Sequence, residues 1–209
     1  MFLGSRTVPE RCEGLSKFQR DRRYHHRAVI DLARSPNFGP RKYGGVPSFV
    51  VIHYTAMATV EDAINRLCDP VYEVSAHYVI AKTGEVTQLV DDDMRAWHAG
   101  AGEWLGVTDI NSWSIGIELD NEGAAPFAEP LMRALELLLA QILNRFSIPP
   151  QNVLGHSDVA PGRKRDPGPK FDWARITRMG LTAQAGQQPG SLSSFRERAQ
   201  ALGYSAKAD

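Results

Sequence analysis

The chain has 209 residues and a formal net charge of zero at pH 7, because 24 Lys and Arg residues balance 24 Asp and Glu residues. Hydrophobic residues make up 43% and charged residues 23%, which are globular proportions and exclude a chain that is disordered throughout. The neutral balance argues against nucleic acid as the main partner, since nucleic-acid-binding domains usually carry a basic excess. No apolar run is long enough for a membrane-spanning helix. Two cysteines, Cys12 and Cys68, are too few for a disulfide scaffold.

The N-terminal segment, residues 1–27, is predicted to be a basic arm in solvent. Residues 20–27 read RDRRYHHR, and such runs of charge are usually solvated. The first residues lack the apolar stretch that is typical of a signal peptide. We therefore expect a cytoplasmic protein, with the periplasm or cell envelope as the alternative compartment if a leader has been removed. No sequence feature indicates the oligomeric state, and a monomer is the default expectation.

Strand and helix signals alternate along the rest of the chain. Short β-branched apolar runs predict strands at residues 48–54, 76–81, 85–90, 113–119 and 152–155. Apolar residues at helical spacing, with caps and breakers at the ends, predict helices at residues 59–67, 130–146 and 171–179. Residues 82–84 predict a hairpin turn, and residues 35–45 predict a loop. The fold class expected is α/β, with a mixed central β-sheet flanked by helices.

The domain boundaries follow from changes in composition. Residues 28–180 contain all of these signals and are predicted to form one domain. Residues 181–209 begin with a linker-like stretch rich in Gln, Gly, Pro and Ser, and a short helix is predicted at residues 194–202.

Two histidines stand out because each follows an apolar strand and precedes a loop. They are His53 and His156, and Asp166 follows in a loop rich in Pro and Gly. Two imidazoles and a carboxylate suit a zinc ion and leave a fourth position open, as in catalytic zinc sites. The spacing alone leaves structural roles open for all three residues, because no local zinc motif is present. His77, inside a hairpin strand, is predicted to be structural.

Five segments occur in the order seen in one enzyme family. They are VIHYTA at residues 51–56, VSAHYVI at 74–80, AWHAG at 96–100, SIGIELDN at 114–121 and GHSDVAPGRKRDPG at 155–168. Across residues 28–176 the chain resembles the zinc-dependent N-acetylmuramoyl-L-alanine amidases of the AmpD and AmiD type. That family has a mixed sheet flanked by helices, in agreement with the strand and helix signals. The resemblance also implies that residues 181–209 are a truncated or vestigial peptidoglycan-binding region.

The resemblance implies a role for each residue of the site. His53, His156 and Asp166 would be the zinc ligands, Glu118 the catalytic glutamate and Lys164 the catalytic lysine. Glu118 lies on an apolar strand, where a carboxylate is costly without a partner, and a salt bridge is the alternative role. The alternative role for Lys164 is that of a solvent-exposed residue in a basic loop.

Substrate-binding residues are also expected near these groups. The candidates are Tyr54, Trp97, His98 and Arg163, with Asn37 as a further cleft residue; core packing is the alternative for Trp97 and His98. Asp158 is expected to cap its loop and not to bind metal.

The implied activity is hydrolysis of the amide between N-acetylmuramic acid, or its 1,6-anhydro form, and L-alanine. The partners would be peptidoglycan fragments and the cofactor Zn²⁺. Two alternatives remain: a non-catalytic peptidoglycan-recognition module of the same fold, and a zinc hydrolase that acts on another amide.

Overall fold

The structure is a computed structural model that describes residues 30–183, 197, 199–201 and 204. The expected basic arm, residues 1–27, lies outside the described residues, and so does much of the expected helix at 194–202. The boundaries predicted for the arm and for the C-terminal region therefore stay predictions.

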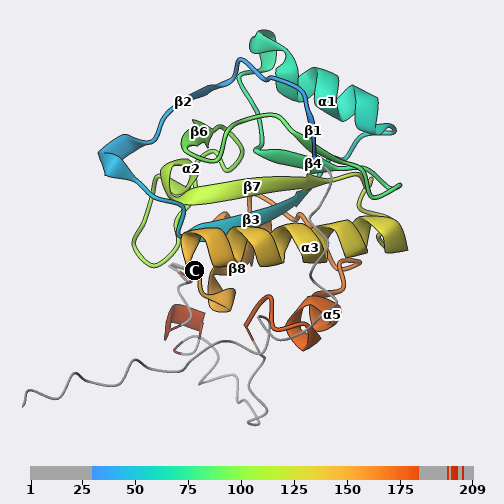
Figure 1. Cartoon of the computed structure of the whole chain (residues 1–209). Coiled ribbons are helices and arrows are strands. Elements are labelled where there is room, and N and C mark those ends of the chain that lie inside the picture. Colours follow the sequence, from blue (N-terminus) through green and yellow to red (C-terminus); the bar gives the residue numbers. More distant parts are fainter. Residues whose placement is uncertain (1–29, 184–196, 198, 202–203, 205–209) are drawn as a thin grey trace, which may run out of the picture.

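Six strands form the central sheet (Figure 1). The hairpin strands β4 and β5 pair antiparallel, whereas the pairs β1–β5, β4–β7, β3–β7 and β3–β8 are parallel. The mixed sheet confirms the expected fold class. Across the sheet the strands are β1 (Ile30–Leu32), β5 (Val86–Gln88), β4 (Tyr78–Ile80), β7 (Ser114–Leu119), β3 (Phe49–Tyr54) and β8 (Val153–Gly155). A second sheet pairs β2 (Phe38–Pro40) with β6 (Met94–Ala96).

The long helix α3 (Glu129–Phe146) covers one face of the sheet. Its apolar stripe includes Leu131, Leu135 and Leu139, which are fully buried. These side chains share a core cluster with the alternate strand residues Val50, Ile52, Ile115, Ile117 and Leu119. Truncation of a leucine in such a core, for example Leu135→Ala, typically costs about 2–5 kcal/mol. This face is therefore the main source of stability and carries no candidate site residue.

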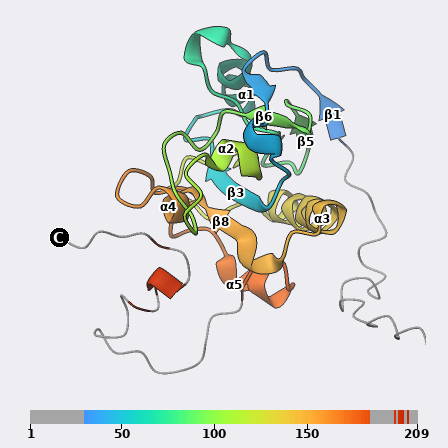
Figure 2. The same cartoon turned by 90° about the vertical axis from the view of Figure 1, so that its left-hand side faces the viewer.

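The other face of the sheet is covered by shorter helices. The helix α1 (Val60–Cys68) packs over β4, with Leu67 against Val79, and its cap residue Thr59 accepts a hydrogen bond from the Asp62 amide at 3.1 Å. Figure 1 shows α1 and α3 on opposite sides of the sheet. Figure 2 shows α2 (Ile110–Trp113) and α4 (His156–Val159) beside β3 and β8, where the cluster of Val51, Ile110, Leu154 and Val159 lies.

Alternation along the strands decides which side chains face the shorter helices. On β3, His53 follows Phe49 and Val51 at a period of two. On β7, Glu118 follows Gly116 in the same way, while Ile117 and Leu119 point to α3. Both candidate residues therefore lie on the face away from α3.

Every strand and helix predicted from the sequence within residues 30–183 is present, and the hairpin strands are three residues each. The sequence signals missed five short strands and α-helices: β1, β2, β6, α2 and α4. The strand β2 lies inside the segment predicted to be a loop; Phe38–Pro40 contains Gly and Pro, and its strand geometry comes from pairing with β6. The remaining elements are α5 (Trp173–Arg178) and three 3₁₀ turns, η3 (Lys42–Gly44), η4 (Pro70–Tyr72) and η5 (Pro150–Asn152).

Tyr204, a described residue near the C-terminus, contacts the domain. Its hydroxyl donates to Asp158, and its ring packs edge-on against Trp104 with centroids 5.0 Å apart. Among the residues that the structure describes, no helix is both long and apolar enough to cross a membrane.

Candidate metal centre

The candidate ligands come from three parts of the chain that the sheet brings together. His53 lies near the end of β3, and His156 follows β8 as the first residue of α4. Because β3 and β8 are parallel neighbours, their carboxyl ends meet at one edge of the sheet. Asp166 arrives from the loop after α4, and the amide of Ser157 binds its backbone oxygen at 2.9 Å. The three residues belong to no local zinc-binding motif, and it is the pairing of strands in the sheet that brings them together.

Three ligand atoms converge at this edge. His53 Nδ1 lies 2.9 Å from His156 Nδ1, and Asp166 Oδ2 lies 3.0 Å from the first and 2.9 Å from the second. His156 Nε2 is 2.9 Å from the Ala99 carbonyl, so a neutral His156 carries its proton on Nε2 and leaves Nδ1 as an acceptor. In a tetrahedral zinc site with bonds of about 2.0–2.1 Å, ligand atoms lie about 3.3 Å apart. These three atoms therefore fit a metal site with two nitrogen ligands and one oxygen ligand.

Burial favours the neutral form of His53 and of its neighbour His98. It lowers the pKa of His53 to about 4. Burial also holds the pKa of His98 well below its usual range, and the neighbouring His53 adds to this effect. A metal ligand has to be an unprotonated imidazole nitrogen, so a neutral His53 at pH 7 can bind without first losing a proton.

Glu118 lies next to His53 in the sheet. The two residues are register partners on the parallel strands β7 and β3. Glu118 Oε2 is buried and has no hydrogen-bond partner among the described residues. Burial raises the pKa of Glu118 well above its usual range, the negative charge of Asp166 raises it further, and Lys164 opposes the shift. The structure thus shows no salt bridge within the described chain that would explain a carboxylate at this position, and it places a potential proton acceptor beside the candidate metal ligands.

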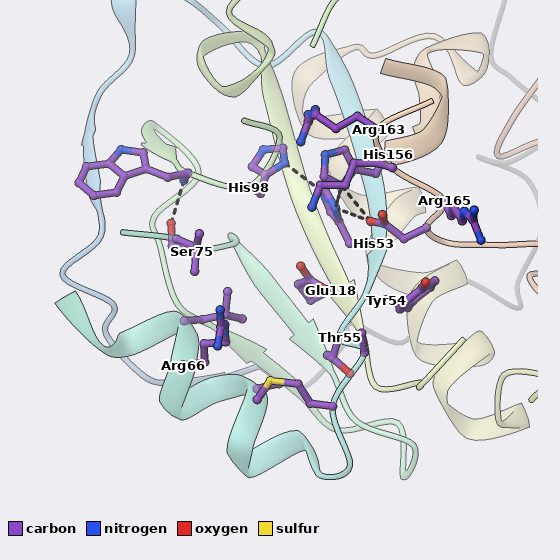
Figure 3. A pocket seen from close by; sticks show the side chains of 18 residues that line it. His53, Tyr54, Thr55, Arg66, Ser75, His98, Glu118, His156, Arg163 and Arg165 are labelled. Carbon is purple, nitrogen blue, oxygen red and sulfur yellow. Dashed lines mark hydrogen bonds and ion pairs between the residues drawn. The ribbon is translucent and has the colours of Figure 1, made fainter. Parts of the chain in front are cut away.

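These groups lie in one pocket of about 480 Å³ (Figure 3). His53, His98 and His156 gather at one end of it, Glu118 lies below them, and Arg66 of α1 forms part of the opposite wall. The expected site residues that line the pocket are His53, Tyr54, Trp97, His98, Glu118, His156, Arg163, Lys164 and Asp166.

Two of the further expectations have clear outcomes. Asn37 does not line the pocket; it is buried, and its side-chain amide donates to the carbonyls of Asp69 at 2.9 Å and Val74 at 2.8 Å. The expectation that Asn37 is a cleft residue is therefore wrong, because this amide holds the loop after α1. Asp158 caps its loop as expected, since Oδ2 accepts from the Gly155 amide at 2.7 Å.

The basic residues of the loop differ in their contacts. The guanidinium of Arg163 donates to the carbonyls of Ala99, at 2.7 Å, and Ala101. Lys164 and Arg165 are exposed, and both line the pocket. Arg163 thus braces the segment that also accepts the His156 proton, whereas Lys164 carries a charge beside the pocket.

Sequence reasoning missed several residues that shape the site. Ser75 Oγ accepts from the Trp97 amide at 2.8 Å, and Asn111 Oδ1 accepts from the amides of His98 and Ala99 at 3.1 and 2.8 Å. A signal was present at Gly116, because a glycine inside an apolar strand often marks close approach of another group. Here that group is the His98 ring.

Comparison with known proteins connects this geometry to a family. The family model described as N-acetylmuramoyl-L-alanine amidase, Amidase_2, matches residues 43–169, a span that includes both histidines, Glu118 and Asp166. The chain belongs to the Amidase_2 family. This membership confirms the resemblance that the five motifs carried and the enzyme class expected from it, an N-acetylmuramoyl-L-alanine amidase.

Several relatives within Amidase_2 resemble the chain along most of its length. It is 35% identical over 189 residues to the N-acetylmuramoyl-L-alanine amidase AmiD of Escherichia coli, an alignment that covers 77% of this chain and 67% of AmiD. It is 32% identical over 159 residues to the 1,6-anhydro-N-acetylmuramyl-L-alanine amidase AmpD of Escherichia coli, with 68% of this chain and 87% of AmpD covered.

Solved structures of the family share the fold. AmiD of Escherichia coli, in complex with anhydro-N-acetylmuramic acid-L-Ala-D-γ-Glu-L-Lys, superposes with a TM-score of 0.71 at 33% identity, covering 85% of this chain and 77% of AmiD. AmpDh3 of Pseudomonas aeruginosa, in complex with an anhydromuramic pentapeptide, gives a TM-score of 0.71 at 29% identity, covering 80% of this chain and 78% of AmpDh3.

Proposed function

We propose that this Amidase_2 protein is a zinc enzyme that hydrolyses the amide between a muramic acid lactyl group and L-alanine. The convergence of His53 Nδ1, His156 Nδ1 and Asp166 Oδ2 beside Glu118 carries the proposal. Two imidazoles and one carboxylate are ligands that zinc commonly takes at catalytic sites, where a fourth position stays open. When bound there, zinc supplies Lewis-acid activation of the scissile carbonyl and of water.

Glu118 is proposed to move the proton of the reaction. A raised pKa suits a carboxylate that accepts a proton from the attacking water and then donates it to the departing nitrogen of alanine. In these reaction steps a carbon–oxygen bond forms between the water and the carbonyl carbon, the amide carbon–nitrogen bond breaks, and the proton ends on the amine. Glu118 Oε2, which has no hydrogen-bond partner in the described part of the chain, is available to take up that proton.

Lys164 is proposed to stabilise the negative oxygen that develops on the former carbonyl. The Lys164 charge acts on both Glu118 and His53, whose pKa values it lowers, so it lies within electrostatic reach of the reacting groups. Loss of one donor to such an oxyanion typically costs about 2.7–4 kcal/mol of transition-state stabilisation.

The substrate class is proposed to be peptidoglycan fragments with a peptide stem, the 1,6-anhydro-muropeptides among them. AmiD and AmpDh3, with which this chain shares its fold, were solved with anhydromuramic peptides. Tyr54, Trp97 and Arg66 line the pocket and would contact such a ligand. The cytoplasm stays the predicted compartment and a monomer the predicted state; cell fractionation and light scattering test them.

A defined anhydro-muropeptide tests the proposal. The purified protein should release anhydro-N-acetylmuramic acid and a free peptide with N-terminal L-alanine, identified by mass spectrometry. A parallel incubation with intact sacculi shows whether the wall itself is also cut. Binding of the muropeptide without release of either product would favour the non-catalytic recognition module, and a cut at another amide would favour a different hydrolase.

A further inference from the structure

We propose that His98 is a positioning residue that sets the tautomer of His53 and so prepares it to bind metal. The proposal rests on the zinc site proposed above. His98 Nδ1 lies 3.0 Å from His53 Nε2, the ring nitrogen that points away from the other two ligand atoms. Figure 3 shows His98 beside His53, with a dashed line for this hydrogen bond.

The direction of the hydrogen bonds follows from Ser114. A serine hydroxyl has one proton to donate, and here it goes to the Ile110 carbonyl at 2.7 Å. The same Ser114 oxygen lies 3.1 Å from His98 Nε2, so it accepts there, and His98 has to carry its proton on Nε2. A neutral imidazole has only one such proton, and His98 Nδ1 is therefore an acceptor.

Because His98 Nδ1 is an acceptor, it favours the tautomer of His53 that carries its proton on Nε2. His53 donates its single proton from Nε2 to His98, and its Nδ1 keeps a lone pair that points to His156 and Asp166. The opposite tautomer would face His98 Nδ1 with a second lone pair and leave two acceptors in repulsive contact. The chain from Ile110 through Ser114 and His98 thus favours the tautomer of His53 that a metal ion at Nδ1 requires.

The position of His98 is built into the sheet. A Cβ atom at Gly116 would lie 2.4 Å from His98 Cγ, so only glycine at this point of β7 leaves space for the ring. Asn111 holds the backbone of His98 and Ala99 through two amides, and Ala99 supplies the carbonyl that orients His156. One short segment therefore orients both metal-binding histidines.

This role differs from direct contact with the substrate. Both ring nitrogens of His98 already have partners, Ser114 and His53, so the side chain has no free polar atom to offer to a ligand in the pocket. Outer partners of metal-binding histidines typically change metal affinity by about 10- to 100-fold when removed. The effect of His98 should therefore be found in metal binding.

The test compares His98→Asn with His98→Leu. An asparagine oxygen can take the place of Nδ1 as acceptor, whereas leucine has a similar size and no acceptor. The control is His77→Asn: His77 is a buried histidine of the same region that binds the Met94 carbonyl and the Gly116 amide and touches no proposed ligand. Thermal unfolding of each variant shows which ones are folded at the temperature of the assay.

Two readouts decide the role, and the first needs no metal. Long-range ¹H–¹⁵N spectra of the metal-free wild type should show His98 protonated on Nε2 and unprotonated on Nδ1, the acceptor that the proposal requires. Competition with a chromophoric chelator should then give a zinc Kd that is about 10- to 100-fold weaker in His98→Leu. It should stay within about threefold of wild type in His98→Asn and His77→Asn. Gly116→Ala, which displaces the ring, should behave like His98→Leu.

Three results would overturn the proposal: a wild-type His98 protonated on Nδ1, a His98→Leu variant with wild-type zinc affinity, or equal losses in His98→Leu and His98→Asn. These results differ from a failure of the proposed function. A wild type that binds no zinc contradicts the zinc enzyme, while the tautomer of His98 is measured without any metal.

Discussion

His53 and Glu118 are direct neighbours across the parallel pair β3–β7, and both project from the face of the sheet away from α3. The register of two strands thus places a metal ligand beside a carboxylate that has no partner for Oε2 among the described residues. A slip of one residue in either strand would turn one of the two side chains into the α3 core. The apolar residues that alternate with them therefore protect the geometry of the site.

Removal of a ligand should remove the metal and the activity together. His53→Ala and Asp166→Ala should each lose bound zinc and amidase activity, because two remaining ligands hold the ion poorly. The fold should survive, since the α3 core makes no use of the ion. Elemental analysis of the purified variants measures zinc per chain. Asp158→Asn is the matched control: this carboxylate of the same segment caps Gly155, and its loss should leave the zinc in place.

Glu118→Gln should separate metal binding from catalysis. The amide keeps the shape of the side chain but cannot accept the proton of the attacking water. We expect full zinc occupancy and a kcat lower by about two to four orders of magnitude, the usual range for loss of a general base. Steady-state kinetics on one defined muropeptide measure this. Near wild-type turnover with zinc bound would mean that another group acts as the base.

The same substitution should stabilise the metal-free protein in a pH-dependent way. In the unfolded chain Glu118 has a pKa of about 4.3, and burial raises it well above that value in the fold. Above about pH 4 the folded state therefore binds more protons than the unfolded state, and stability falls as the pH rises. Relative to wild type, Glu118→Gln should gain little at pH 4 and more at pH 7–8.

Thermal unfolding of the metal-free proteins across this pH range measures the gain. Glu85→Gln, at an exposed position beside the hairpin turn, is the control and should show no such gain. A Tm difference between Glu118→Gln and wild type that stays constant with pH would contradict the assignment of an ionisable, desolvated carboxyl.

Lys164 and Arg165 should differ in kinetics although they are adjacent. Lys164→Ala should lower kcat at full zinc occupancy, because its charge is needed most when the oxyanion forms. Arg165→Ala should raise KM and change kcat little if Arg165 only attracts the anionic peptide stem. Steady-state kinetics of both variants decide this. A change in KM alone for Lys164→Ala, with a collapse of kcat for Arg165→Ala, would reverse the two roles.

Arg163 differs from Lys164 and Arg165 in that its side chain is held by backbone carbonyls. Its guanidinium is bound to the carbonyls of Ala99 and Ala101, so Arg163→Ala should loosen the segment that orients His156. We expect a weaker zinc affinity, measured by chelator competition. An unchanged affinity with a raised KM would instead restore Arg163 to the substrate-binding group.

The sequence predicted those strands and helices that have a clear pattern of apolar residues. Strands β3 and β7 and helix α3 carry strong apolar periodicity, and each has bounds within one residue of the prediction. The strands β1, β2 and β6 contain Asp31, Gly39 with Pro40, and Arg95, so no continuous apolar run marks them as strands. They owe their geometry to their pairing partners. Local patterns do not contain that information.

The sequence predicted which residues belong to the candidate site better than it predicted the hydrogen bonds between them. The motifs identified His53, His156, Asp166 and Glu118, and the strand alternation explains why His53 and Glu118 share a face. The hydrogen bonds that join His98 to Ser114, and Asn111 to Ala99, are tertiary contacts between polar side chains, and hydrophobic periodicity carries no information about them. For the same reason Asn37, a polar residue in a predicted loop, was mistaken for a cleft residue.

Titration of the metal-free protein with zinc, followed by the rate of release of the L-alanine peptide from an anhydro-muropeptide, tests the central claim most directly. Activity should be absent without metal, rise in proportion to added zinc and level off at one equivalent per chain. Full activity in the metal-free protein, or a plateau reached only at several equivalents, would contradict a single catalytic zinc held by His53, His156 and Asp166.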